Sequence, residues 1–273
     1  MNAVQAVVLG FLQGLTEFLP ISSTAHIRVL PAFVGWRDPG AAFTAITQLG
    51  SLVAVLVYLR HEVGRILWTW LRSLWTPSLR GELDARMGWY VGLGTIPLAL
   101  CGVLFADFVE TAARNLWVIS GALIGFGALL WVSDRVTTQK RDLNHLRLRD
   151  AVVVGLFQAL ALIPGTSRSG ATMTGALFMN LDREAATRYS FLLSIPAVLL
   201  AGLYELRKIG ETGVPGIVPT ALATLVAFGV AYATIGWMLR FVARHSMLLF
   251  VVWRVVLGLL IIGLIMTGVL SAT

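Results

Sequence analysis

The sequence predicts an all-α integral membrane protein, and three observations support that prediction. Of the 273 residues, 57% are hydrophobic and only 13% are charged, and the mean hydropathy is +0.81. Apolar runs extend along the whole chain and leave no long polar stretch for a soluble module. Two short polar motifs interrupt runs that are otherwise typical of membrane helices. We therefore expect residues 1–273 to form a single membrane domain.

The first two apolar runs, residues 3–19 and 24–35, are each too short to span a bilayer comfortably, since a span takes about 20 apolar residues. Pro20 separates them. Together they predict a re-entrant pair of helices that enters and leaves the membrane on the same face. Irregular backbone at membrane depth is tolerated only where protein or a polar cavity surrounds it. The turn between the two helices is therefore a candidate functional site.

Three complete spans are expected in the rest of the first half, over residues 41–59, 89–106 and 116–133. Between the first two, residues 61–88 interleave arginine with tryptophan, a mixture that is typical of an interfacial helix lying on a bilayer. A short acidic link with Asp107 and Glu110 joins the second span to the third.

The pattern then restarts. Residues 155–158 repeat residues 10–13, and residues 164–167 repeat residues 20–23, at an offset of about 144 residues. The second half adds another re-entrant pair and three spans, over residues 150–163 with 169–181, 186–206, 217–240 and 247–270. We predict two repeats, about 1–135 and about 150–273, each a re-entrant pair plus three transmembrane helices. Because each copy crosses three times, the second is inverted relative to the first.

Basic residues predict the orientation. Residues 60–88 and the link 134–149 are separated by two spans, so they share a side, and each carries five lysines or arginines. That side should be cytoplasmic. The two re-entrant pairs then enter from opposite faces, and their polar tips meet near the midplane. The net charge of +7 follows from this topology and from contact with anionic lipid, so no nucleic-acid partner is expected.

The two tips are rich in residues that suit an anion. Serine and threonine are good helix N-caps, and helix N-termini present free N–H groups and a positive dipole end to phosphate. Arg168 adds a guanidinium whose fork matches phosphate oxygens. The candidate phosphate-binding residues are Ser22, Thr24, Ser167, Ser169, Gly170 and Thr172. An anion that also partitions into a bilayer is a lipid phosphate or diphosphate.

Glu17 and His26 make the predicted binding site a candidate catalytic site. Ionisable side chains in a membrane cost about 2.5–3.5 kcal/mol each and usually mark function. His26 is a candidate general acid or base, or a nucleophile, and Ser23 is a candidate nucleophile that this imidazole activates. Water activated by His26 is a third candidate. Glu17 either orients the histidine or, with Gln13 one helical turn before it, binds a divalent cation.

The strings QGLTEFLPISSTAH at residues 13–26 and PGTSRSGAT at residues 164–172 resemble the two signature motifs of the undecaprenyl-diphosphatase family of the bacitracin-resistance type. The resemblance covers the whole chain in length, hydropathy and repeat. It implies an enzyme of the inner membrane that removes the terminal phosphate of undecaprenyl diphosphate. That reaction regenerates the lipid carrier for cell-wall synthesis. It confers resistance to bacitracin, which acts by sequestering the diphosphate.

By motif match, the resemblance gives the central roles to Glu17, Ser23, His26 and Arg168, at a site open to the periplasmic side. It also implies a divalent cation, Mg²⁺ or Ca²⁺, and it allows a homodimer. The family has glutamate or glutamine where this chain has Gln13, so a second carboxylate for the metal is missing here. Ala25 stands where the family usually has glycine. Gln48 and Arg254 match family positions and are further candidates.

Three other functions fit parts of the sequence. A transporter or flippase for a lipid phosphate or another anion explains inverted repeats with broken helices, but it needs no nucleophile. The phosphatidic-acid-phosphatase class is superficially similar at residues 23–26 and 167–168, yet its lysine–arginine–proline motif and its downstream histidine are missing. A structural scaffold leaves Glu17 and Arg168 unexplained. A phosphate-release assay separates the enzyme from the transporter.

Overall fold

Six long apolar helices dominate the protein, whose computed structural model describes residues 1–105, 115–206 and 215–271. Each is long and apolar enough to cross a membrane. They are α3 (Gly40–Tyr58), α5 (Leu83–Leu104), α7 (Leu116–Val136), α10 (Arg183–Leu206), α11 (Ile217–Val242) and α12 (Leu248–Met266). The protein is thus a multi-pass, all-α membrane protein, as predicted. The acidic link with Asp107 and Glu110 lies outside the described residues.

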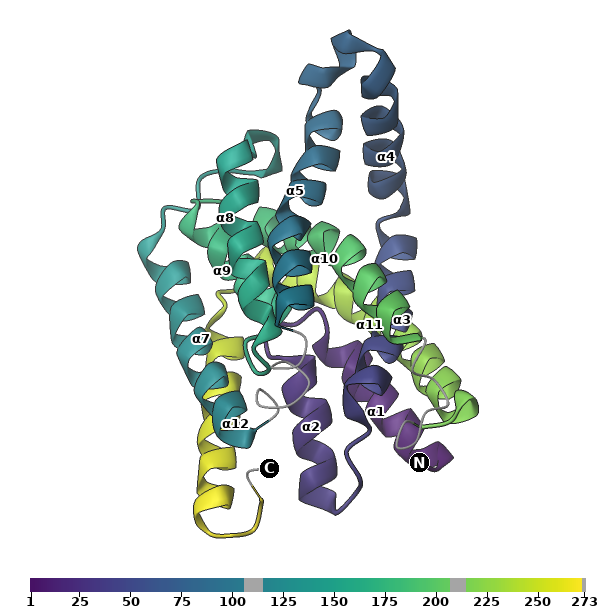
Figure 1. Cartoon of the computed structure of the whole chain (residues 1–273). Helices are drawn as coiled ribbons and strands as arrows, with labels where there is room; N and C mark the ends of the chain where they lie inside the picture. Colours follow the sequence, from purple (N-terminus) through teal and green to yellow (C-terminus); the bar gives the residue numbers. More distant parts are fainter. Residues whose placement is uncertain (106–114, 207–214, 272–273) are drawn as a thin grey trace.

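Two pairs of shorter helices accompany the long ones. The first pair is α1 (Ala3–Thr16) with α2 (Ser23–Val34), and the second is α8 (Leu148–Ala159) with α9 (Arg168–Phe178). In Figure 1 the first pair lies in the lower half and the second in the upper half, so that their turns face each other near the centre. Each pair precedes three long helices, which is the predicted order within a repeat. The inverted orientation of the two copies in a membrane stays a prediction.

The segment 61–88 differs from the single interfacial helix that the sequence predicted. Helix α4 (Arg60–Trp75) follows α3 almost without a break, and the short 3-10 helix η1 (Pro77–Gly81) returns the chain into α5. The α4–α5 hairpin projects beyond the other helices (Figure 1). The indole of Trp70 packs edge-on against Trp89, with ring centroids 5.5 Å apart. The prediction of a single helix is wrong, because the chain turns at η1 and α4 packs on α5. The interfacial position of α4 stays a prediction.

Glycines allow α11 to pack tightly between α1 and α3. A Cβ added at Gly10 of α1 would collide with the carbonyl oxygen of Ala223, and one at Gly50 of α3 would collide with that of Thr224. Small residues at such crossings let helix backbones approach closely, which is how membrane helices gain van der Waals contact. Since α1 is held in this way, the position of its C-terminal end, where Glu17 lies, is fixed.

The basic link between the two halves folds against the pair of helices α8 and α9. The Arg141 guanidinium forms a two-pronged ion pair with the buried Asp150 carboxylate, with Nη2 at 2.6 Å from Oδ2. The same guanidinium donates to the carbonyl of Met179, just after α9. One arginine therefore ties the link to the start of α8 and to the end of α9, which positions the second tip.

Candidate active site

Both tips end in a serine with unusual backbone geometry. Ser22 has φ 73° and Ser167 has φ 69°, a left-handed region that residues other than glycine rarely occupy. Each side chain caps the following helix, accepting from the N–H of Ala25 at 3.3 Å and of Gly170 at 3.2 Å respectively. The two serines are therefore structural equivalents. This corrects the predicted alignment, which paired residue 167 with residue 23, by one position.

The corrected alignment places different chemistry at equivalent positions. The first helical residue is Ser23 at one tip and Arg168 at the other. Within the described residues, no acceptor contacts the backbone N–H groups of residues 22–24 and 167–169. Each tip thus offers a hydroxyl or a guanidinium together with free N–H donors, the arrangement that binds phosphate at helix N-termini.

Glu17 connects the two tips. It lies at the end of α1 and is only 6% exposed. Its Oε2 accepts hydrogen bonds from Ser23 Oγ at 2.7 Å and from Gln13 Nε2 at 2.6 Å. Its Oε1 accepts from Arg168 Nη2 in an ion pair. Ser169 adds a second link, because its hydroxyl donates to the carbonyl of Leu19 at 2.9 Å. Contacts between residues about 150 positions apart thus build one site.

A cavity of about 160 Å³ lies between the tips and has a polar and an apolar part. Its polar lining comes from Glu17, Ser22, Ser23, Thr24, Gln48, Ser167 and Arg168. Its apolar lining includes Leu98, Ala161, Leu162, Ile163, Ala197 and Ala201. Gln48 reaches this cavity from α3, which brings that candidate to the site. A cavity divided in this way suits an amphiphile with an anionic head.

His26 lies beside the first tip without contacting Ser23. Its Nδ1 is 2.7 Å from the carbonyl oxygen of Ser22, and its Nε2 is 2.9 Å from the indole nitrogen of Trp253. An indole N–H can only donate, so Nε2 accepts and Nδ1 carries the proton donated to Ser22. Both ring nitrogens are therefore engaged. The expected Ser23–His26 pair does not form in the structure, and Glu17 takes its place.

The remaining predicted residues support the tips from behind. The hydroxyl of Thr172 contacts the carbonyl of Arg168 at 2.8 Å and the hydroxyl of Ser190 at 2.6 Å. Gly170 lies against the guanidinium of Arg254. Gln13 contacts Glu17 through its amide nitrogen, while its buried Oε1 has no partner. Thr172 and Gln13 are thus next to the site but are not among the residues that line the cavity.

The described residues hold no group of three or more His, Cys, Asp or Glu that could by itself bind a metal ion. The oxygens near the tips are those of Glu17, Gln13 and the hydroxyl residues. Mg²⁺ is usually bound by one or two carboxylates together with substrate phosphates. This set of donors therefore fits a cation that a bound diphosphate would also ligate.

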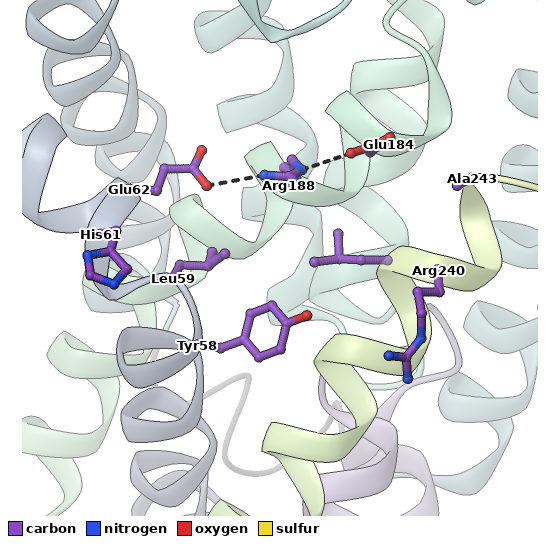
Figure 2. A pocket seen from close by; sticks show the side chains of 9 residues that line it. Tyr58, Leu59, His61, Glu62, Glu184, Arg188, Arg240 and Ala243 are labelled. Carbon is purple, nitrogen blue, oxygen red and sulfur yellow. Dashed lines mark hydrogen bonds and ion pairs between the residues drawn. The ribbon is translucent and has the colours of Figure 1, made fainter.

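A second cavity, of about 460 Å³, lies where α3 passes into α4, next to the start of α10 and the end of α11 (Figure 2). At its wall, Arg188 lies between two carboxylates, 3.4 Å from Glu62 and 3.1 Å from Glu184. None of the predicted site residues lines this cavity. Its acidic and basic groups largely neutralise each other, so it lacks the features of an anion site.

Comparison with known proteins identifies the family of the chain. The family described as "Bacitracin resistance protein BacA" matches residues 6–260. The chain belongs to this family. It is similar to the protein named undecaprenyl-diphosphatase in Thermobifida fusca, with 51% identity over 99% of this chain and 93% of that protein. In a Nocardioides species, a protein of the same name is 51% identical over the full length of both chains. "Undecaprenyl-diphosphatase 2" of Streptomyces coelicolor is 47% identical over 99% of this chain and 97% of its own.

Some parts of the site in this BacA-family chain could not be predicted from the sequence. Trp253 lies 227 residues from His26 in the sequence, and its local sequence does not distinguish it from a tryptophan at a membrane surface. Leu98 and Ala201 belong to ordinary apolar helices. Only the crossing of the helices brings these residues to the tips, so no local signal identified them.

Proposed function

We propose that this protein is an undecaprenyl-diphosphate phosphatase, which hydrolyses undecaprenyl diphosphate to undecaprenyl phosphate and inorganic phosphate. The observation that carries the proposal is the Ser23 hydroxyl, hydrogen-bonded to Glu17 in a cavity that also holds Arg168. The names of the relatives support the choice of lipid. The reaction would recycle the lipid carrier for cell-wall synthesis and confer bacitracin resistance.

In this proposal the diphosphate binds between the tips. The free N–H groups of residues 22–24 and 167–169 and the guanidinium of Arg168 face its oxygens. The lipid tail follows the apolar part of the cavity, formed by residues 161–163, Leu98 and Ala201. Most of these residues adjoin the second tip. We therefore place the phosphate that carries the lipid tail near the second tip, and the terminal phosphate near Ser23.

Ser23 Oγ attacks the terminal phosphorus, and Glu17 accepts the hydroxyl proton. The bond from this phosphorus to the bridging oxygen breaks, undecaprenyl phosphate leaves, and Ser23 carries the phosphoryl group. Glu17 first loses its proton to the departing undecaprenyl phosphate or to solvent. Water then attacks the phosphorus of the phosphoserine, Glu17 takes the proton of that water, and the bond from phosphorus to Ser23 Oγ breaks. Glu17 returns the proton to Ser23 Oγ, which restores the serine and releases phosphate. Phosphoryl transfer has a loose transition state, so positioning and charge stabilisation matter more than a strong base. For His26 to act as nucleophile or to activate water, Nε2 would first have to leave Trp253.

A divalent cation, Mg²⁺ or Ca²⁺, is part of the proposal. Glu17 would hold it together with the substrate phosphates, with the unpartnered Oε1 of Gln13 close by. When bound, such a cation neutralises phosphate charge. Ser23, Arg168 and the tips perform the steps described above.

We also propose that the protein lies in the bacterial inner membrane with its site open to the periplasm. The basic residues of 60–88 and 134–149 favour a cytoplasmic position for both segments. The first tip then enters from the periplasmic face. A homodimer is compatible with this placement and stays a prediction.

The test is phosphate release from undecaprenyl diphosphate by the purified protein in detergent, with and without a chelator. Glu17→Ala and Arg168→Ala are measured beside the wild type. We expect metal-dependent release that falls by roughly two orders of magnitude or more in both variants. A wild-type protein that binds the lipid but releases no phosphate under any cation would exclude the enzyme and favour a lipid-phosphate transporter.

A further inference from the structure

Arg254 is the largest side chain that is completely buried in the described structure. It lies on α12, and its guanidinium donates to backbone carbonyls of both tips. Nη1 is 3.2 Å from the oxygen of Pro20, and Nη2 is 3.1 Å from that of Gly165 and 2.9 Å from that of Thr166. Two further bonds reach α7, at the carbonyls of Ala122 and Leu123. One side chain thus holds three segments that are distant in sequence.

Arg254 binds carbonyl groups of residues that come just before the reactive parts of the tips. Pro20 comes two residues before the capping Ser22, and Thr166 comes one residue before the capping Ser167. Carbonyl groups cannot hydrogen-bond to one another, so the two turns need a donor between them. A planar guanidinium offers five N–H donors in a fixed geometry. Arg254 therefore bridges the two turns at their backbone carbonyls, in addition to the side-chain links of Arg168 with Glu17 and of Ser169 with Leu19.

The charge of Arg254 has no counterpart. No carboxylate within ion-pair distance of it occurs in the described ranges, whereas Arg168 is paired with Glu17. A buried charge without a partner is costly, and the five carbonyls compensate only part of that cost. The positive charge remains just behind two helix N-termini, where it can stabilise a bound anion in a low-dielectric surrounding.

The neighbouring glycine leaves room for this arrangement. A Cβ added at Gly170 would lie 2.7 Å from Arg254 Nη1, a separation that forces the guanidinium or the helix to shift. Gly170→Ala is therefore a second way to disturb the contact, without removing the charge.

We propose that Arg254 is a positioning residue that sets the spacing of the two tips and supplies the unpaired positive charge that draws the diphosphate between them. The inference rests on the proposed function, because it assigns this role toward the substrate of the same site.

The experiment compares Arg254→Met, Arg254→Lys and Gly170→Ala with the wild type. Arg240→Met is the matched control, because it removes an exposed arginine near the end of the neighbouring α11. Folding is checked by size-exclusion chromatography and thermal unfolding in detergent. The readouts are kcat and KM for undecaprenyl diphosphate, and the Kd of inorganic pyrophosphate by calorimetry, which needs no turnover.

We expect Arg254→Lys to keep the pyrophosphate Kd within about threefold, because the charge stays, while kcat falls about tenfold because the fork is lost. Arg254→Met should weaken pyrophosphate binding at least about tenfold and lower kcat about 100-fold. Gly170→Ala should lower kcat about tenfold with little change in Kd. Arg240→Met should behave as the wild type.

A folded Arg254→Met protein with kcat and Kd within about threefold of the wild type would overturn the proposal. So would an Arg254→Lys variant that binds pyrophosphate as weakly as Arg254→Met. If Arg254→Met does not fold, Arg254→Lys and Gly170→Ala test the proposal instead. A kcat equal to that of the wild type in both variants would then overturn the proposed role of Arg254 in the spacing of the tips. A wild type that binds pyrophosphate but releases no phosphate would refute the proposed function alone, and the Kd series would still test Arg254.

Discussion

The hydroxyl of Ser23 donates a 2.7 Å hydrogen bond to the carboxylate of Glu17, which lies six positions earlier, on the other side of the first turn. Arg168 from the opposite tip holds the other oxygen of that carboxylate. The proposed nucleophile Ser23, the proposed base Glu17 and the guanidinium of Arg168 are therefore joined through the Glu17 carboxylate.

Ser23→Ala should lower phosphate release by about 10³-fold or more, because the variant loses the nucleophile and keeps the binding groups. Rapid acid quench of the wild type with a substrate labelled in its terminal phosphate should trap the label on Ser23. Ser78→Ala, at an exposed serine in η1, is the control and should be fully active. Label on His26, or full activity of Ser23→Ala, would contradict the assignment.

Arg168→Lys keeps a positive charge and loses the fork that can contact Glu17 and a phosphate together. We expect kcat/KM to fall about 100-fold, because a lysine ammonium does not match phosphate oxygens in the same geometry. Steady-state kinetics of phosphate release measure the effect. Arg188→Lys, in the second cavity, is the matched substitution. If both variants had equal kcat/KM values, Arg168 would have no specific role.

Trp253→Phe tests the position of His26. Phenylalanine keeps the aromatic ring that stacks on the imidazole but lacks the N–H that Nε2 accepts. We expect the free energy of unfolding to fall by about 1 kcal/mol, with activity within about threefold of the wild type.

His26→Ala should lower activity by no more than about tenfold, since the imidazole fixes the Ser22 carbonyl and does not contact Ser23. A loss as large as that of Ser23→Ala would return His26 to the reaction.

Gln13→Glu tests the proposed cation. A carboxylate at this position would stand beside Glu17, where Gln13 Nε2 now lies 2.6 Å from Oε2. Two carboxylates attract Mg²⁺ or Ca²⁺ more strongly than one. The cation concentration for half-maximal activity should therefore fall several-fold, and a chelator should still abolish activity. Titration of each cation against phosphate release measures this. An unchanged midpoint would place the cation away from Gln13.

Asp150→Asn tests the anchor of the second tip. Asp150 is 1% exposed, and its carboxylate accepts from Arg141 and from the backbone N–H of Arg147. Removing the charge from one partner of a buried pair costs about 3 kcal/mol or more. The melting temperature in detergent should fall by several degrees, with KM unchanged at temperatures where the variant is folded. Asp142→Asn, in the exposed part of the link, should change neither value.

Local patterns predicted much of the fold. Apolar length identified all six long helices, and interruption by proline, serine and glycine identified the turns within both pairs of shorter helices. The failure at 61–88 shows the limit of such patterns. A helix with arginine and tryptophan has the same composition whether it lies on lipid or packs on another helix. Composition alone therefore does not predict that α4 packs on α5.

The sequence by itself determined the class of protein, the places where the chain turns, and the candidate residues at those places, because hydropathy and backbone preference act over short distances. Only the tertiary structure decided the partners of those residues. The positive φ values of Ser22 and Ser167 show that these two serines hold equivalent positions in the two tips. The close packing of α1 on α11 places Glu17 beside Ser23. The crossing of α12 brings Arg254 against the backbone of both tips. Hydrogen bonds depend on distances of about 3 Å between atoms, and residues more than a hundred positions apart reach such distances only when the helices have packed.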